Sequence, residues 1–269
     1  MNTIESAILG VVQGLTEYLP VSSSGHLAVG AEMMGSTNAE ENLAFTVLVH
    51  AATCLSSVIV FRKEIQAIFA DLFKFKWNEG TRYAAMIVVA DIPVIIAGLL
   101  LADQIDDLFA NNLVFIGCMW LLTATLLLLT IRAVGTKKHL SFLNTFIVGI
   151  GQTFAILPGL SRAGTTIATG LLVGIDRAHI ARFSFLMVIP PVLGKTILDT
   201  KDALEGQGAF TNLDFVPALT GFLAAFISGW LACRVMLNVV QKGKVHYFAF
   251  YCMAAGILAI LVGSQIISW

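Results

Sequence analysis

Residues 10–35 read GVVQGLTEYLPVSSSGHLAVGAEMMG, and residues 149–174 read GIGQTFAILPGLSRAGTTIATGLLVG. Shifting the first stretch onto the second by 139 positions aligns five identical residues, namely Gly10 with Gly149, Gln13 with Gln152, Ser22 with Ser161, Gly25 with Gly164 and Gly35 with Gly174. Each copy carries a polar turn with proline and serine. Polar groups are costly in hydrocarbon unless they face a cavity or one another. Two related polar breaks in an apolar chain therefore predict a site at the interface of an internal repeat.

The rest of the chain is strongly apolar. Of its 269 residues, 57% are hydrophobic and only 12% are charged, whereas about 25% charged residues is usual in a soluble domain. The mean hydropathy is +0.85. The net charge of −1 gives no electrostatic support for nucleic-acid binding. We therefore expect a single all-α integral membrane domain over residues 1–269, surrounded by membrane lipids and with no nucleic-acid partner.

Six apolar stretches are candidates for transmembrane helices, because a crossing needs about 20 apolar residues. They cover, in chain order, residues 43–62, 83–103, 112–131, 183–200, 214–235 and 246–268. The pair Pro190 and Pro191 is expected to kink the fourth of these helices. The loop at 62–82 has apolar residues at helical spacing and is expected to form an amphipathic helix on the membrane surface.

The distribution of basic residues predicts how these helices are oriented. The loops at 62–82, 132–139 and 234–244 are basic, and we expect them to face the cytoplasm. The loops at 103–111 and 201–214 are mainly acidic, and they are then expected on the outer side.

This orientation leaves the two related segments without a net crossing of the membrane. Residues 1–42 must begin and end outside, and residues 140–182 must begin and end inside. The simplest solution is two re-entrant helix pairs that enter from opposite faces, so that 1–131 and 140–269 form an inverted repeat. Non-helical backbone at that depth is tolerated only where it lines protein or water, so the two turns are expected to meet around a polar cavity. The alternative is that residues 4–19, residues 141–157 and the stretches after each turn are full spans.

The first turn carries groups suited to phosphate chemistry. Gln13 and Glu17 are four residues apart and share one face of a helix. His26 lies three residues after Ser23, and a serine with a neighbouring base is an activated nucleophile. A helix that begins at serine caps presents free backbone N–H groups, which bind phosphate. The further candidates for phosphate binding in this turn are Ser22, Ser24 and Gly25.

The second turn adds a permanent positive charge. Arg162 carries a guanidinium fork that fits phosphate oxygens. An arginine inside an apolar chain needs an anion, and a structural ion pair with Glu17 is the alternative to a bound phosphate. The neighbouring candidates for phosphate binding are Ser161, Gly164, Thr165 and Thr166.

Two further polar residues lie inside expected spans. Asp91 precedes Pro93 by two residues, and we interpret it as a partner for the backbone freed by the proline or as a residue that reaches the cavity. We interpret His50 as a core histidine with satisfied hydrogen bonds.

At this point the motifs resemble those of a known family. The stretch QGLTEYLPVSSSGH at 13–26 resembles the first signature of the undecaprenyl-diphosphatase family, the BacA-type bacitracin-resistance proteins. The stretch PGLSRAGTT at 158–166 resembles the second, and the resemblance covers essentially the whole chain. Gln13 stands where many members have glutamate, which puts a two-carboxylate metal site in doubt. Ala163 and Ser24 stand where serine and threonine are usual.

The resemblance implies a phosphatase of the bacterial plasma membrane. Its reaction converts undecaprenyl (C55) diphosphate to undecaprenyl phosphate and inorganic phosphate, which recycles the carrier lipid of cell-wall synthesis. It also implies an outward-facing site with a divalent cation, Mg²⁺ or Ca²⁺, at Glu17 and with lower priority Gln13. Carried over by position, Ser23 is the nucleophile, His26 its acid–base partner and Arg162 the diphosphate clamp. Direct attack by a metal-activated water is equally compatible with these residues.

A transporter or flippase for a phosphorylated prenyl lipid is the alternative function. Inverted repeats with broken helices and an anion site at the midplane are typical of transporters. The sequence leaves the oligomeric state open, and a homodimer is one arrangement to test.

Overall fold

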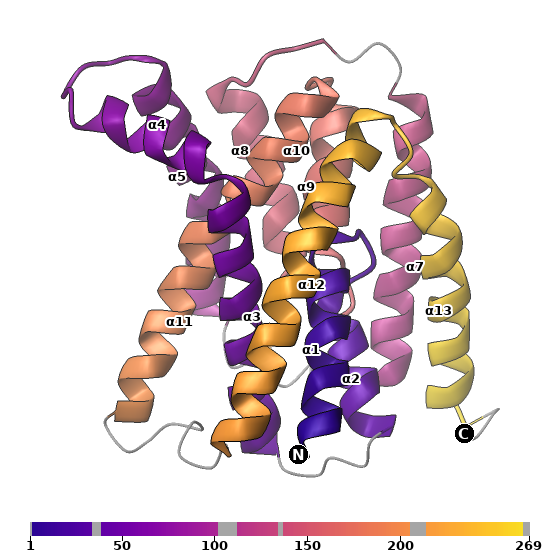
Figure 1. Ribbon diagram of the computed structural model, residues 1–269. Coiled ribbons are helices and arrows are strands. Elements are labelled where there is room, and N and C mark those ends of the chain that lie inside the picture. Colours follow the sequence, from indigo (N-terminus) through magenta and orange to yellow (C-terminus); the bar gives the residue numbers. More distant parts are fainter. Residues whose placement is uncertain (1, 34–38, 102–111, 134–136, 205–213, 266–269) are drawn as a thin grey trace.

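The computed structural model describes residues 2–33, 39–101, 112–133, 137–204 and 214–265, and every regular element in these ranges is a helix (Figure 1). The helices are, in chain order, α1 (Thr3–Tyr18), α2 (Ser23–Met33), α3 (Ala39–Val60), α4 (Arg62–Leu72), α5 (Glu79–Leu100), α7 (Leu113–Leu129), the 3₁₀ turn η1 (Thr130–Arg132), α8 (Phe142–Phe154), α9 (Arg162–Leu172), α10 (Arg177–Leu186), α11 (Ile189–Leu204), α12 (Phe215–Gln241) and α13 (Tyr247–Gly263). The expected all-α class is confirmed. The expected outer loop at 103–111, and most of that at 201–214, lie outside the described residues.

Within the described residues, three helical segments are long and apolar enough to cross a membrane, namely α5, α7 continued by η1, and α12. Helices α3 and α4 meet the same criterion only as a pair, and they are bent by 75° relative to each other. Helices α8 and α13 are apolar but shorter. The structure thus supports a multi-pass membrane protein with three such helices, or four if the bent pair is one span.

Local sequence accounts for where the helices before the two turns begin and end. The side chain of Asn2 accepts hydrogen bonds from backbone N–H groups at the start of α1. The side chain of Glu5 accepts one from the backbone N–H of Asn2, which completes a capping box. Ser141 caps α8 in the same way. Helix α1 ends before Leu19, whose backbone is extended, because a residue that precedes proline, here Pro20, is biased away from helical conformation.

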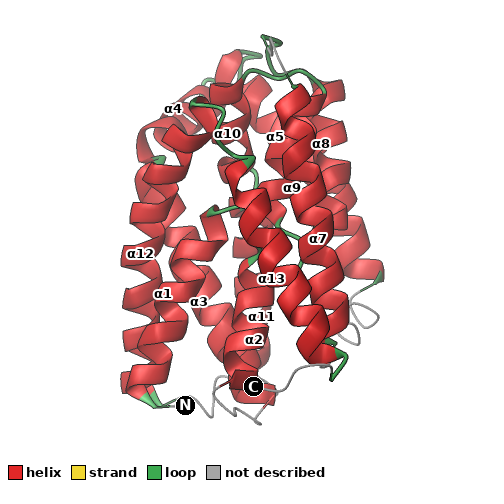
Figure 2. Cartoon of the chain, turned by 90° about the vertical axis from the view of Figure 1, so that its right-hand side faces the viewer, coloured by secondary structure: helices red, strands yellow, loops and turns green. Residues whose placement is uncertain are grey.

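The two related segments form two helix hairpins in opposite halves of the molecule. Figure 1 shows α1 and α2 in the lower half and α8 and α9 in the upper half, with their turns toward the middle, and Figure 2 gives the same arrangement from the side. Helix α1 packs along α12, helix α8 packs along α5, and helices α7 and α13 pack on each other. The long helices α12 and α5 therefore each flank one hairpin, and the α7–α13 pair forms a further part of the bundle.

The expectation of one kinked helix over 183–200 is wrong. Helix α10 ends at Leu186 and helix α11 begins at Ile189, so that Pro190 and Pro191 lie in the first turn of α11. Proline lacks an N–H donor and its ring clashes with the preceding turn, so it is tolerated at a helix start and disrupts a helix interior. The two prolines therefore separate two helices instead of kinking one.

The amphipathic helix expected in the 62–82 loop is α4. None of its residues is buried, and Figure 1 shows it projecting sideways from one end of the bundle. The connection between α7 and α8 and the turn between α12 and α13 lie at the same end. The three loops that carry basic residues are therefore on one side of the molecule.

Helices α7 and α13 approach each other through two glycines. A Cβ atom on Gly117 would lie 2.7 Å from the carbonyl oxygen of Gly256, and a Cβ atom on Gly256 would lie 2.8 Å from the carbonyl oxygen of Gly117. Small residues at such points let membrane helices pack by direct backbone contact. The interface has no room for a methyl group at either position.

We expect Gly117→Ala to lower the unfolding temperature by several degrees, because overpacking of this kind costs about 1–3 kcal/mol. Scanning fluorimetry of the detergent-solubilised protein measures this unfolding temperature. Gly98→Ala on α5 is the matched control, since nothing lies within 4 Å of its added Cβ. Equal effects of the two substitutions would contradict the assignment of a tight α7–α13 contact.

Candidate active site

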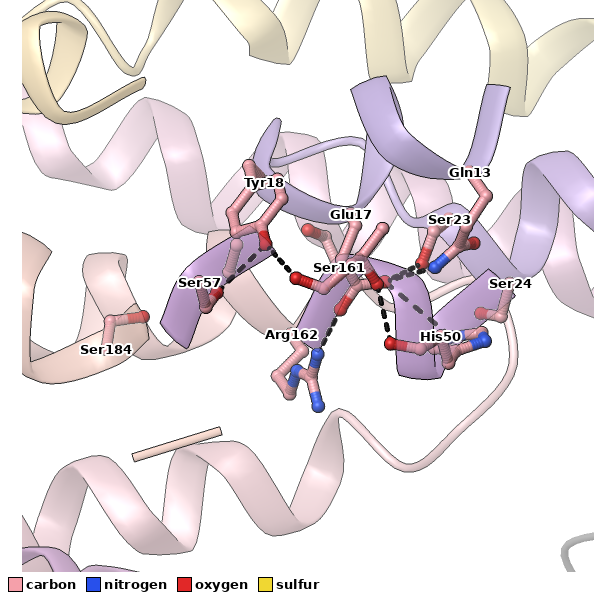
Figure 3. Close-up of polar contacts among 12 residues, drawn as sticks. Gln13, Glu17, Tyr18, Ser23, Ser24, His50, Ser57, Ser161, Arg162 and Ser184 are labelled. Atoms are coloured by element: carbon pink, nitrogen blue, oxygen red, sulfur yellow. Dashed lines mark hydrogen bonds and ion pairs between the residues drawn. The ribbon is translucent and has the colours of Figure 1, made fainter. Parts of the chain in front are cut away.

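Glu17 is the centre of the polar cluster where the two hairpin turns meet (Figure 3). Its side chain is only 9% exposed. Oε1 accepts a hydrogen bond from Nη2 of Arg162 in an ion pair. Oε2 accepts hydrogen bonds from Nε2 of Gln13 at 2.9 Å and from Oγ of Ser23 at 2.7 Å. Both carboxylate oxygens are therefore occupied by donors that come from three different helices.

The local sequence explains how these groups arrive at one point. Helix α1 places Gln13 and Glu17 on the same face, one turn apart, as the spacing predicts. Ser23 and Arg162 are the first residues of α2 and α9, so each lies at the inner end of its hairpin. The structural ion pair between Glu17 and Arg162, which the sequence offered as an alternative, is present.

His50 also belongs to this cluster, which the sequence analysis did not predict. Its Nε2 lies 3.6 Å from Oε2 of Glu17, and its Nδ1 lies 2.8 Å from the carbonyl oxygen of Thr46. The carbonyl only accepts, so Nδ1 donates and Nε2 is directed at Glu17. No motif surrounds His50 in the sequence, and only the packing of α3 against α1 reveals its place.

Tyr18 anchors α1 to α3 next to Glu17. Its hydroxyl donates to the carbonyl oxygen of Thr53 and lies 2.7 Å from Oγ of Ser56 and 2.9 Å from Oγ of Ser57. The ring packs edge-on against Phe185 of α10. Because Tyr18 is buried and both its hydroxyl and its ring are in contact with other helices, it also restrains the adjacent Glu17.

A small, open cavity lies beside this cluster. Its lining is formed by Glu17, Tyr18, His50, Thr53, Cys54, Ser57, Arg162, Ala163, Ser184, Phe185, Val188 and Val192. One part of the wall is charged and the other part, from α10 and α11, is mainly apolar. Such a cavity offers an anion-binding group beside an apolar wall, which is the combination that an amphiphilic ligand requires.

The other candidate residues of the first turn support its backbone. Ser22 is buried, has a φ of 68°, and its Oγ accepts a hydrogen bond from the backbone N–H of Gly25 at 3.3 Å. Oγ of Ser24 lies 3.2 Å from Oγ of Ser22. None of these three residues is part of the cavity lining.

The second turn is held by its own hydrogen bonds. The backbone N–H of Ser161 donates to Oγ1 of Thr123, and Oγ of Ser161 accepts from the N–H of Gly164 at 3.1 Å. Oγ1 of Thr166 lies 2.6 Å from Oγ of Ser184, a residue of the cavity wall. Oγ1 of Thr165 is buried without a hydrogen-bond partner in the described part of the chain.

His26 is close to Ser23 in sequence, but its ring is bonded elsewhere. Its Nδ1 lies 2.7 Å from the carbonyl oxygen of Ser22, and its Nε2 lies 2.6 Å from the hydroxyl of Tyr251 on α13. The hydroxyl of Ser23 donates to Glu17. The structure thus brings Ser23 together with Glu17, and not with His26 as the spacing suggested. Tyr251 was not predicted, because nothing in its local sequence marks it.

The repeated glutamine contacts a carboxylate in both copies. Nε2 of Gln152 donates to Oδ1 of Asp91 at 2.9 Å, and both side chains are buried. Asp91 is thus paired with the residue that aligns with Gln13. The remaining oxygens, Oδ2 of Asp91 and Oε1 of Gln152, have no partner among the described residues. This second pair is not part of the cavity lining.

The described side chains around Glu17 do not fit a divalent cation held by the protein alone. No group of three or more His, Cys, Asp or Glu side chains within the described residues could hold a metal ion. Both oxygens of Glu17 are occupied, and Gln13 turns its amide nitrogen toward it. Oε1 of Gln13 is buried without a partner. A cation at Glu17 and Gln13 would require these groups to rearrange, and it stays a prediction.

Comparison with known proteins agrees with the motifs. The family model described as bacitracin resistance protein BacA matches residues 6–258. An undecaprenyl-diphosphatase of Bacteroides fragilis is 49% identical over 263 residues, which is 97% of this chain and 98% of the relative. One from Bacteroides thetaiotaomicron is 49% identical over 262 residues, 97% and 99% of the two chains. One from Methanobrevibacter smithii is 38% identical over 277 residues, 97% and 98% of the two chains. The match over nearly the whole length shows that this chain belongs to the BacA family of bacitracin-resistance proteins.

Proposed function

We propose that this chain is a membrane hydrolase that converts undecaprenyl diphosphate to undecaprenyl phosphate and inorganic phosphate, and so recycles the carrier lipid of cell-wall synthesis. The relatives named undecaprenyl-diphosphatase support this function over 97% of the chain. The observation that carries it is the contact of Arg162, Glu17 and Ser23 beside a cavity with a charged and an apolar wall.

In this proposal Arg162 binds the diphosphate. Its guanidinium fits two phosphate oxygens at once and stabilises the negative charge that gathers on the transferred phosphoryl group. In the free protein this guanidinium is paired with Glu17. A diphosphate carries more negative charge than a single carboxylate, so the substrate can compete for Arg162 and release Glu17 for proton transfer.

Ser23 is the proposed nucleophile of a covalent route. Its Oγ would form a bond to the terminal phosphorus, and the bond from that phosphorus to the bridging oxygen would break, which releases the lipid monophosphate. Glu17 already accepts the Ser23 hydroxyl hydrogen, so it is placed to take this proton. Water would then cleave the phosphoserine and restore the serine hydroxyl. Direct attack of water on the diphosphate is the second route.

The backbone at the two helix starts is proposed to hold the remaining phosphate oxygens. Helices α2 and α9 begin at the turns, and N–H groups at a helix start attract anions. In the free protein the N–H groups of Gly25 and Gly164 donate to serine side chains, and a phosphate would replace these acceptors. The residues proposed to take part are Ser22, Ser24, Gly25, Ser161, Gly164, Thr165 and Thr166. The first isoprenoid units would lie against Phe185, Val188 and Val192, which form the apolar wall of the cavity.

We further propose six spans and two re-entrant hairpins, arranged as an inverted repeat of residues 1–131 and 140–269. Three observations support the repeat. The hairpins lie in opposite halves of the molecule (Figure 1). The packing of α1 on α12 has a counterpart in that of α8 on α5. Gly117 and Gly256, which contact each other, are separated by 139 residues, the same spacing that relates the two turns.

The proposed location is the bacterial plasma membrane, with the basic end of the bundle in the cytoplasm and the site open to the outer side. Lysine and arginine are enriched in cytoplasmic loops of membrane proteins. Helix α4 and the two other basic connections share one end of the bundle, which supports this orientation. A homodimer stays a prediction to be tested by the mass of the detergent-solubilised protein.

The first test is phosphate release from undecaprenyl diphosphate by the purified protein. We expect turnover by the wild type, and a loss of at least about 100-fold in kcat/KM for Arg162→Ala, because loss of a charge-stabilising donor costs about 10²–10³ in rate. The kcat/KM of Arg162→Lys is expected to lie between those of the wild type and Arg162→Ala, since lysine keeps the charge and loses the guanidinium fork.

Arg234→Ala is the matched control, because Arg234 stacks on Trp230 of α12 and is not part of the cavity lining. Absence of phosphate release by folded wild type would overturn the proposed function. The same assay with EDTA tests the predicted cation. If EDTA abolishes phosphate release and added Mg²⁺ or Ca²⁺ restores it, the predicted cation is supported. Phosphate release that EDTA leaves unchanged contradicts the predicted cation.

The two routes differ in what Ser23→Ala does. The covalent route predicts that phosphate release falls by more than about 1,000-fold, because the nucleophile is gone. Attack by water predicts a smaller loss, of about 10-fold, from the missing hydrogen bond to Glu17. Ser264→Ala at the end of α13, whose hydroxyl bonds only to its own helix among the described residues, is the control. A phosphoserine trapped by acid quench would independently establish the covalent route.

A further inference from the structure

Three successive carbonyl oxygens in the turn between α1 and α2 are each bonded to a side chain from another part of the fold or from α2. The pairs are Cys252 Sγ to Pro20 at 3.4 Å, Trp120 Nε1 to Val21 at 2.8 Å, and His26 Nδ1 to Ser22 at 2.7 Å. The turn is non-helical and lies inside an apolar chain, where a buried carbonyl without a donor costs about 1–3 kcal/mol. For Pro20 and Val21 these side chains therefore replace the donors that a helix would supply. The Ser22 carbonyl accepts the ring of His26 in addition to the backbone N–H of His26 at 3.3 Å.

The bond to Ser22 determines which proton His26 carries. A carbonyl oxygen accepts only, so Nδ1 of His26 must hold a hydrogen and donate it. In the neutral ring, Nε2 is then a lone-pair acceptor, and its partner at 2.6 Å is the hydroxyl of Tyr251. Tyr251 therefore donates to His26. Both ring nitrogens are used, and neither faces Ser23.

Ring contacts fix the imidazole in this orientation. The ring of Tyr251 stacks on that of His26, with centroids 5.6 Å apart and an angle of 12° between the planes. The indole of Trp120 contacts the imidazole in a tilted arrangement, with centroids 5.0 Å apart and an angle of 59° between the planes. Gly25 leaves room for that indole, because a Cβ there would lie 3.0 Å from it. Rotation of His26 toward Ser23 would break two hydrogen bonds and both ring contacts.

The residue held in this way is conformationally unusual. Ser22 has a φ of 68°, a region that residues with a side chain rarely adopt and that costs of order 1–3 kcal/mol unless the surroundings enforce it. The hydrogen bond from His26 is made to the carbonyl of this residue, which directly precedes Ser23. The conformation of Ser22 thus sets the direction of Ser23, whose hydroxyl points at Glu17.

We infer that Tyr251 and His26 form a positioning pair, in which Tyr251 orients His26 and His26 holds the Ser22 carbonyl, so that Ser23 stays against Glu17. The pair acts through the backbone of the turn and exchanges no proton with Ser23. This inference rests on the proposed function and assigns Tyr251, on α13, a part in the reaction although it is not in the cavity lining.

Two substitutions of His26 separate positioning from acid–base catalysis. His26→Asn places an amide N–H near the position of Nδ1, so it keeps the donor to Ser22 and removes the titrating ring. We expect kcat of His26→Asn within about 10-fold of wild type, and kcat of His26→Ala lower by about 100-fold, the loss that a misplaced reacting group causes. An acid–base role predicts that both variants lose about 10²–10⁴ in rate and one limb of the pH profile.

Tyr251→Phe tests the second member of the pair. It keeps the stacked ring and removes the donor to Nε2, and we expect kcat to fall by about 10-fold with an unchanged shape of the pH profile. In the His26→Ala background the same change is expected to have no further effect, because the two residues act in series. Tyr247→Phe, on an exposed tyrosine of the same helix that contacts His246, is the matched control.

Amide hydrogen exchange at residues 21–26 gives a readout that does not depend on turnover. We expect faster exchange there in His26→Ala and Tyr251→Phe, and near wild-type exchange in His26→Asn. The inference is overturned if His26→Asn is as inactive as His26→Ala, or if Tyr251→Phe leaves both turnover and exchange unchanged. Lack of phosphate release by the wild type would instead reject the proposed function, and the exchange data would still decide whether the pair holds the turn.

Discussion

The ion pair between Glu17 and Arg162 is the interaction on which the rest of this structure depends. Each residue lies at the inner end of a hairpin from a different half of the chain, and the Glu17 side chain is almost completely buried. An isolated charge in such a place is far more costly than a paired one. Neither hairpin can therefore bury its polar turn alone, and the meeting of the two turns is a condition of the fold. The same meeting brings the Ser23 hydroxyl and the Arg162 guanidinium onto the Glu17 carboxylate, beside the cavity that Glu17 and Arg162 line.

Bringing two turns into the interior requires donors for backbone that is no longer helical. The first turn obtains them from side chains of α2, α7 and α13, and the second from Thr123 of α7. Helix α7 thus serves both turns and α13 serves the first, and Gly117 and Gly256 let these two helices pack closely against each other. The scaffold and the candidate site thus share residues, since His26 and Thr123 bond the turns from which Ser23 and Arg162 follow.

The two copies of the repeated segment have diverged in how they use the same contact. In the first copy Gln13 donates to Glu17 within one helix, and the carboxylate reaches the cavity. In the second copy Gln152 donates to Asp91 of another helix, and the pair is closed off between α5 and α8. An amide and a carboxylate therefore recur at related places, but only one carboxylate lies next to an arginine and a serine. The two related segments therefore differ in their polar surroundings, although their sequences align.

The sequence alone determined the all-helical membrane class, the family and the two turns that carry the polar residues. These features are local or compositional, because apolar length, proline and serine turns, and i to i+4 spacing do not depend on distant contacts. The tertiary structure alone decided that Ser23 pairs with Glu17, that His26 pairs with Tyr251, and that His50 belongs to the cluster. It also decided that the helix over 183–200 is broken. A motif places residues along a helix. Which side chains from α3 and α13 reach the motif residues depends on how the helices pack. That packing is set by glycine contacts and buried hydrogen bonds between segments far apart in the chain.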